Sequence, residues 1–222
     1  MATKKPKGSA CFVGGTLIQL EDCEIAIEDL QEGDMVLTVS GEYEPVKWVG
    51  HFSKTIDASD PDASLNSYPV RIAKDAFAPN QPKRDLYVSR LHSVWIDDVL
   101  VPAMDLVNDL TITIEERSEV TYYHLELPTH NVIYAEGLPA ESFLDDNNKS
   151  IFVTDTGPVS KVTIFDPEMP LLTSKEIWDA KGFAKVARKG EDPVVDQIFE
   201  RLLLRAKLLS SADDSVEQRK VA

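Results

Sequence analysis

SACFVGGTLIQLEDCEIAIEDLQEGDMVLT, residues 9–38, is the stretch that decides the fold. A single cysteine, Cys11, stands where a polar, lysine-containing start gives way to short apolar runs, and Gly14 and Gly15 follow it. The alternation of apolar and polar residues after Thr16 predicts β-strands, and Gly33-Asp34 predicts a turn before another strand. A free cysteine is ordinarily a small buried hydrophobe, so Cys11 gains meaning only from residues further along the chain.

The same texture continues to about residue 144. Short runs rich in Val, Ile, Tyr and Trp are separated by Gly, Pro, Asn and Asp, and the polar residues 53–69 predict a surface loop. Short strands without intervening helical patterns predict a mainly β module. The expected strands after residue 40 lie in GEYEPVKWVGHF (41–52), PVRIA (69–73), DLYVS (85–89), SVWID (93–97), VLVPA (99–103), LTITIE (110–115), VTYYHLEL (120–127) and NVIYAEG (131–137).

A helical tail is expected after the hydrophilic break at 145–150. TSKEIWDAKGF (173–183) and DPVVDQIFERLLLRAKLLSS (192–211) carry helical signals, with Asp192 as N-cap and Pro193 at the first helical position. We expect the apolar stripe of the second helix to pack on the β module; left exposed, it would be a partner site. That stripe comprises Val194, Val195, Ile198, Leu202 and Leu203.

Composition excludes several classes of partner. The 222-residue chain has a net charge of −15 and a pI of about 4.6, which argues against nucleic acid and anionic membranes. No apolar run reaches the roughly 18 residues of a membrane span, and MATKKPKGSA does not resemble a secretory signal. We therefore expect a cytoplasmic chain, unless it is part of a secreted precursor, with Cys11 free and Cys23 packed.

Four segments carry the chemistry. CFVGGT begins at Cys11, IEDLQEGDMV supplies a turn and strand, SRLH places Ser89 three residues before His92, and YYHLELPTHNVIYAEG contains His124 and His130. In this order they resemble the Hint (Hedgehog/intein) domain family, and most of all its bacterial autoprocessing branch. The resemblance spans roughly residues 11–147 and implies a compact, pseudo-symmetric, horseshoe-like β module with the cysteine at its centre.

The resemblance also implies a reaction. Cys11 attacks the carbonyl of Ala10, and an N–S acyl shift converts the Ala10–Cys11 peptide bond into a thioester. Such a step needs a deprotonated thiol, stabilisation of the oxyanion and a proton for the departing nitrogen. We expect Ser89 to hold the scissile amide and His92 to supply the proton, because histidine titrates near neutrality.

Two further histidines correspond to family positions. His130 falls where the family carries a late histidine, which implies a part in the second step. His124 stands where inteins commonly carry an aspartate, so its role is left open. No metal or cofactor is expected, because His124 and His130 lack metal-ligand spacing and no Cys-x-x-Cys accompanies them.

Splicing is not expected. The places usually held by His-Asn at the downstream junction correspond to Ala140-Glu141, and glutamate does not cyclise as asparagine does. The expected outcome is cleavage of the chain's own N-terminal segment by water, a thiol or another small nucleophile. We divide the chain into an extein-like arm (1–10), a Hint domain (11–147) and a tail of extended segment and helices (148–222). The alternatives are an idle Hint-fold interaction module, whose partner protein the sequence does not identify, and a Cys/His hydrolase acting on other molecules.

Overall fold

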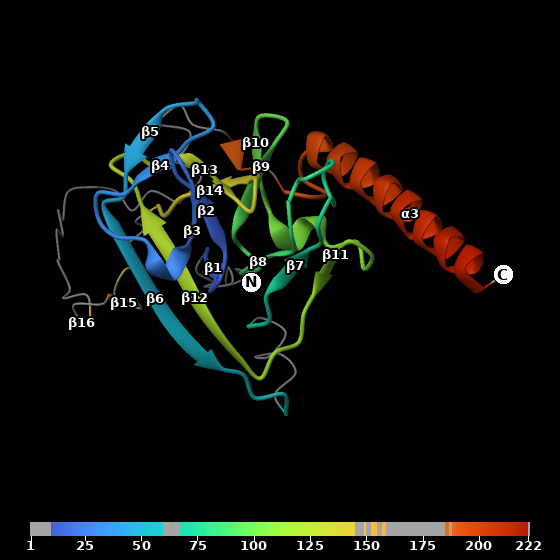
Figure 1. Ribbon diagram of the computed structural model, residues 1–222, viewed down its shortest axis with the longest axis horizontal. Coiled ribbons are helices and arrows are strands. Elements are labelled where there is room, and N and C mark those ends of the chain that lie inside the picture. Colours follow the sequence, from blue (N-terminus) through green and yellow to red (C-terminus); the bar gives the residue numbers. More distant parts are fainter. Residues whose placement is uncertain are drawn as a thin grey trace, which may run out of the picture.

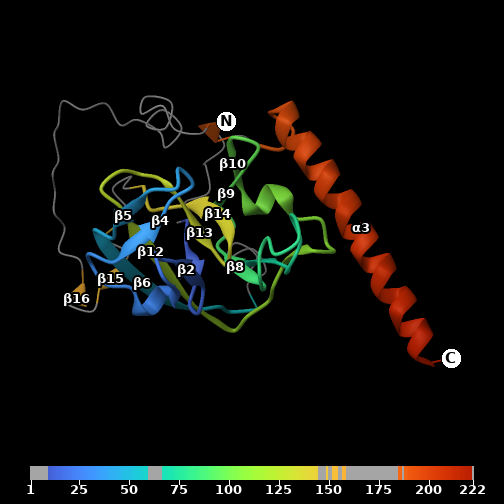
Figure 2. The same cartoon turned by 45° about the horizontal axis from the view of Figure 1, so that its top comes forward.

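The computed structural model describes residues 10–59, 67–144, 149, 152–154, 157–158, 185–186 and 188–221. The described part is mainly β, with one long helix at its C-terminal end (Figures 1 and 2), so the predicted fold class is confirmed. The first sheet contains β1 (Phe12–Val13), β6 (Trp48–Thr55), β7 (Val70–Ile72), β8 (Leu86–Val88), β11 (Ile112–Ile114), β12 (Glu119–Glu126), β15 (Val153–Thr154) and β16 (Gly157–Pro158). The second contains β2 (Leu17–Gln19), β3 (Glu24–Ala26), β9 (Ser93–Ile96), β10 (Val99–Pro102), β13 (Val132–Ala135), β14 (Leu138–Glu141) and β17 (Lys185–Val186). The remaining elements are the hairpin of β4 (Met35–Leu37) and β5 (Tyr43–Pro45), two short 3-10 helices, η1 (Ile27–Asp29) and η2 (Ala103–Leu106), and α3 (Pro193–Val221).

The order of strands places β1 in the middle of the first sheet. That order is β11-β7-β8-β1-β12-β6-β15-β16, so the strand that follows Cys11 is covered on both edges. Phe12 pairs with Val88 of β8 on one side and with Tyr123 of β12 on the other, both antiparallel. The backbone next to the cysteine is therefore fixed by segments about 80 and 110 residues away along the chain.

Side-chain alternation along β1 divides the interior into two clusters. Successive side chains of a strand point to opposite faces. Phe12 accordingly enters the main core, which contains Ile18, Leu125 and many other aliphatic side chains, whereas Cys11 and Val13 enter a second cluster rich in aromatic residues. The cysteine thus lies at the boundary between the two cores.

Most expected strands are confirmed. The structure adds β14 and, in the tail, the short strands β15, β16 and β17, which were not predicted. β14 was not predicted, because LPAE lacks apolar alternation and contains Pro139; its pairing with β13 and β9 creates the strand. β6 continues through Thr55 into the expected loop, since its backbone pairs with β12 up to Glu119. Cys23 was expected to pack, but it is exposed, and both cysteines are free thiols.

The predicted helix at 192–211 is confirmed and extends to Val221 as α3; the one expected at 173–183 lies outside the described residues. Asp192 caps the N-terminus, its carboxylate accepting the N–H of Val194 at 3.0 Å. Val195, Ile198 and Leu202 are buried in the main core, as expected, but Val194 is 40% exposed. Adjacent helical residues are about 100° apart, so Val194 and Val195 do not share one face.

Ion pairs and hydrogen bonds secure the first half of α3 to the β module. Arg201 pairs with Asp97 at 2.9 Å, and Arg205 donates to the carbonyl of Asp75 at 2.8 Å. The second half of the helix extends away from the module (Figures 1 and 2). No helix in the described part of the chain is both long and apolar enough to cross a bilayer.

Replacing Leu202 with alanine tests the docking of α3. Leu202 is 1% exposed and its truncation opens a cavity, so we expect Leu202→Ala to lower the free energy of unfolding by about 2–4 kcal/mol. Leu204→Ala is the matched control: Leu204 is 61% exposed, and its loss is expected to cost less than about 0.5 kcal/mol. Denaturant unfolding measures both, and equal losses would contradict the packing described.

Candidate active site

Cys11 is held, fully buried, at the entrance to β1. Its cluster includes Trp48, Tyr122, Phe143 and Phe152, which surround it with apolar surface. Burial, together with the nearby Cys11, raises the pKa of Tyr122, whose hydroxyl donates to the carbonyl of Ser67 at 2.9 Å. The surroundings of the cysteine are therefore dry and low in dielectric, where every electrostatic interaction is stronger than in water.

Ser89 forms two hydrogen bonds with Cys11. The amide N–H of Cys11 donates to Ser89 Oγ at 2.8 Å, and the amide N–H of Ser89 donates to the carbonyl of Cys11 at 2.8 Å. The N–H of His92 in turn donates to the carbonyl of Ser89 at 3.0 Å, which closes the turn between β8 and β9. The sequence-predicted serine hydroxyl therefore lies at the nitrogen of the Ala10–Cys11 peptide bond.

The three other predicted residues are histidines that come together from separate parts of the chain. His92 belongs to the turn before β9, His124 to β12, and His130 lies two residues before β13. The rings of His92 and His124 are 5.3 Å apart, centroid to centroid, and all three side chains are buried. We call them the histidine cluster.

The ring of Phe12 lies against this cluster. Its centroid is 4.1 Å from that of His92 and 5.9 Å from that of His124. Phe12 thus contacts the imidazoles directly. The Cys11 side chain enters the aromatic cluster on the other face of β1. His124 also meets that cluster, its ring 5.2 Å from the ring of Phe143.

Burial keeps His92 and His124 neutral at rest. Desolvation, and secondarily the nearby His130, lowers the pKa of His92 from 6.5 to about 3. Desolvation and the other two histidines lower the pKa of His124 as well. Neither ring nitrogen of His92 has a hydrogen-bond partner within the described residues. A neutral, unbonded imidazole can accept a proton and pass it on.

Glu141 is the site residue that sequence reasoning missed. It lies at the end of β14, where its Oε1 accepts the N–H of Ser93 at 2.6 Å and its Oε2 lies 3.8 Å from Nε2 of His130. Burial raises the pKa of its carboxyl to about 7. The sequence showed only that no asparagine stands here; the signal available was an acidic residue within the apolar run LPAESF.

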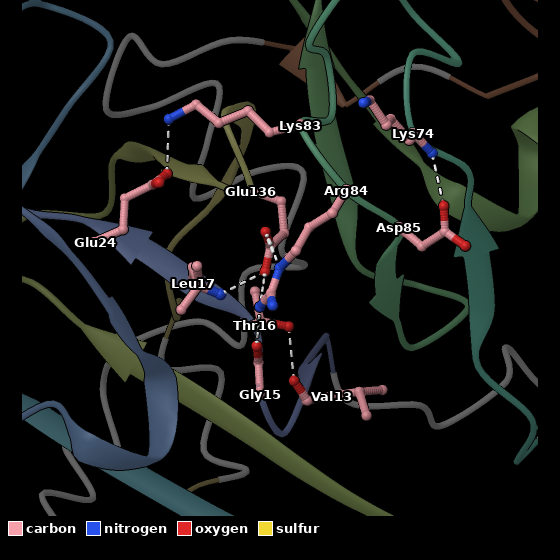
Figure 3. Close-up of polar contacts among 10 residues, drawn as sticks. All are labelled: Val13, Gly15, Thr16, Leu17, Glu24, Lys74, Lys83, Arg84, Asp85 and Glu136. Atoms are coloured by element: carbon pink, nitrogen blue, oxygen red, sulfur yellow. Dashed lines mark hydrogen bonds and ion pairs between the residues drawn. The ribbon is translucent and has the colours of Figure 1, made fainter.

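A second polar group braces the glycine turn that follows β1 (Figure 3). Glu136, 2% exposed, accepts the N–H of Leu17 at 2.7 Å and two bonds from the Arg84 guanidinium at 2.6 and 2.7 Å. Arg84 also donates to the carbonyl of Gly15, which has a φ of +83°. Glu136 lies in the turn between β13 and β14, so a residue late in the chain holds the turn after Cys11 in place.

Within the described ranges, no group of three or more His, Cys, Asp or Glu side chains is arranged to hold a metal ion.

Substituting Arg84 tests the brace. Arg84→Met leaves the Glu136 carboxylate buried without its cation, so we expect a loss of roughly 2–4 kcal/mol in the free energy of unfolding. Lys83→Met is the matched control, because Lys83 pairs with Glu24 at 2.8 Å in an exposed setting worth about 0–1 kcal/mol. Chemical denaturation compares the two; a loss for Arg84→Met no larger than the control's would contradict the assigned role.

The buried imidazoles predict a stability that falls with acid. His92 binds a proton at about pH 6.5 when unfolded but only near pH 3 when folded, so its contribution is complete above pH 6.5 and is lost on acidification toward pH 3. The slope is about 1.4 kcal/mol per pH unit for one such group. Glu141 acts oppositely: its pKa rises from 4.5 to about 7, and its contribution is lost as the pH rises through that range.

We therefore expect His92→Gln to lose stability less steeply between pH 6.5 and 4.5 than the parent, measured by denaturant unfolding at each pH. His51→Gln, which removes a histidine of β6 outside the cluster, is the control for the loss of one histidine side chain. An unchanged slope in His92→Gln would contradict the neutral, buried state of this imidazole.

Comparison with known proteins identifies a family for this chain. A family model described as the Hint domain matches residues 10–147. Among solved structures, a DnaB intein from Synechocystis sp. PCC 6803 is 14% identical with a TM-score of 0.45, the match covering 61% of this chain and 100% of that one. The gp41-1 intein is 16% identical with a TM-score of 0.43, covering 60% and 98%. A bacterial intein-like domain from Clostridium thermocellum has the same identity, TM-score and coverage.

No curated protein matched the chain in sequence. The family match spans more than half of the chain, which therefore belongs to the Hint domain family, a family of autoprocessing-type domains.

Proposed function

We propose that the chain cleaves itself at the Ala10–Cys11 bond by an N–S acyl shift, without splicing. The observation that carries this proposal is the hydrogen bond from the Cys11 amide to Ser89 Oγ at 2.8 Å. A hydroxyl at the nitrogen of a buried peptide bond contributes little to packing. In an acyl shift it can donate a hydrogen bond to that nitrogen as the C–N bond breaks. The Hint fold itself implies processing of the segments that flank it.

The proposed first step moves one proton and exchanges one bond. Cys11 Sγ attacks the carbonyl carbon of Ala10, the C–N bond breaks, and the thiol proton ends on the Cys11 nitrogen as it becomes an amine. Ser89 Oγ accepts the amide N–H in the ground state and can donate its own O–H once that nitrogen becomes pyramidal. The neutral imidazole of His92, behind Phe12, supplies the acceptor for a proton in transit.

The proposed second step is attack on the thioester by water, a thiol or another small nucleophile. The strand that would have to carry a cyclising asparagine instead carries Glu141, whose carboxylate is bound to Ser93. Cys11 is 0% exposed, which favours reaction with its own chain over a separate protein substrate, and so disfavours a trans-acting hydrolase.

In this proposal residues 11–147 are the processing domain, residues 1–10 are the segment released, and residues 148–222 are the tail. At the start of the tail, Lys149 and Phe152 lie beside Trp48 of the domain. Phe152 is 1% exposed beside Trp48, and the Lys149 ammonium lies 5.2 Å from the Trp48 ring centroid. The start of the tail therefore helps to keep the reacting bond dry.

The test is the intact mass of the purified chain before and after incubation with dithiothreitol. We expect loss of residues 1–10 from the parent and from Cys23→Ala, in which the exposed cysteine is removed, but not from Cys11→Ala. Loss of the segment from Cys11→Ala, or its retention by the parent under all conditions, would contradict the proposal.

The same assay measures the contribution of Ser89. Ser89→Ala removes the hydroxyl at the scissile nitrogen, and we expect cleavage to slow by roughly 10²-fold, the usual effect of losing one positioned donor. Ser89→Thr keeps the hydroxyl and is expected to remain within a few fold of the parent.

A further inference from the structure

Glu141 has an unusual set of neighbours for a buried carboxyl group. It is 7% exposed, on a strand that lies between β13 and β9 in the second sheet. One oxygen is fixed by the Ser93 N–H at 2.6 Å, directly after His92, and the other faces Nε2 of His130 at 3.8 Å. Its two oxygens thus connect the turn that holds Ser89 to the third histidine of the cluster.

The titratable group that faces this carboxyl among the described residues is the imidazole of His130. His130 faces it before β13, and His92 and His124 are coupled to His130 electrostatically from the turn before β9 and from β12. Among the described residues, no lysine or arginine forms an ion pair with Glu141. Two other buried acids do have cationic partners: Glu126 pairs with Lys47 and Lys149, and Glu136 pairs with Arg84. A carboxylate kept for stability alone would be expected to have such a cation.

We propose that Glu141 is a positioning residue of the self-cleavage reaction, whose carboxylate orients His130 and stabilises the protonated form of that imidazole. This rests on the proposed function. At 3.8 Å an ionised carboxylate acts on the imidazole through its charge and favours the imidazolium, whereas a neutral carboxyl group does not. Glu141 therefore lets one member of an otherwise neutral cluster hold a proton during the reaction.

The proposal fixes the direction of a pH effect. Because burial raises the pKa of Glu141 to about 7, the carboxylate form grows as the pH rises through neutrality. Cleavage supported by Glu141 should increase over the same range, by roughly tenfold between pH 6 and 8 for one group with this midpoint.

The experiment compares dithiothreitol-induced release of residues 1–10 by the parent and by Glu141→Gln from pH 6 to 8. Glutamine keeps the shape and accepts the Ser93 N–H, but it cannot ionise. The ratio of the two rates removes the pH dependence of the thiol, and we expect it to rise roughly tenfold. Glu141→Asp, which retains the charge, should recover the rise in part, and Glu126→Gln, which removes a buried acid that faces lysines, should keep the parent profile.

A constant ratio, or equal loss in Glu141→Asp and Glu141→Gln, would overturn the proposal while leaving self-cleavage intact. If the parent does not cleave, the proposed function fails, and NMR then decides the pairing. In the Cys11→Ala background, Glu141→Gln should shift the titration of the His130 imidazole to lower pH, with its signals assigned from His130→Gln. An unshifted titration would overturn the pairing itself.

Discussion

The structure depends on placing one peptide bond at the middle of a sheet. Two hydrogen bonds of 2.8 Å between Cys11 and Ser89 fix the chain at the entrance to β1, and pairing with β8 and β12 covers both of its edges. The bond is thereby removed from water and set against a hydroxyl. Burial is what allows so few polar groups to act strongly, because their interactions are not screened by solvent.

The same burial sets the electrostatics of the site. Imidazoles in an apolar interior lose their protons and carboxyl groups keep theirs. The pKa of His92 falls from 6.5 to about 3 and that of Glu141 rises from 4.5 to about 7, which reverses their usual order. The Cys11 thiol lies on one face of β1, and the Phe12 ring lies on the other face, where it contacts His92. His92 and His124 are therefore neutral before the proposed reaction begins.

The sequence predicted what is local. Alternation located most strands, Asp192 and Pro193 located the start of α3, and the spacing of SRLH placed a hydroxyl that the structure brings to Cys11. It did not predict β14, which exists through pairing with two other strands, or the burial of Glu141 beside His130. The ion pair between Arg84 and Glu136 could not be predicted either, because the two residues are 52 positions apart and only the folded chain brings them together.

The central claim, that the Ala10–Cys11 bond passes through a thioester, is tested most directly by trapping with hydroxylamine. This nucleophile attacks a thioester readily and a peptide bond hardly at all, so mass spectrometry of the released segment identifies the intermediate. The account predicts a fragment of residues 1–10 ending in a hydroxamate on Ala10, absent from Cys11→Ala. A fragment ending only in a free carboxylate at every hydroxylamine concentration, or a hydroxamate that also forms in Cys11→Ala, would contradict it.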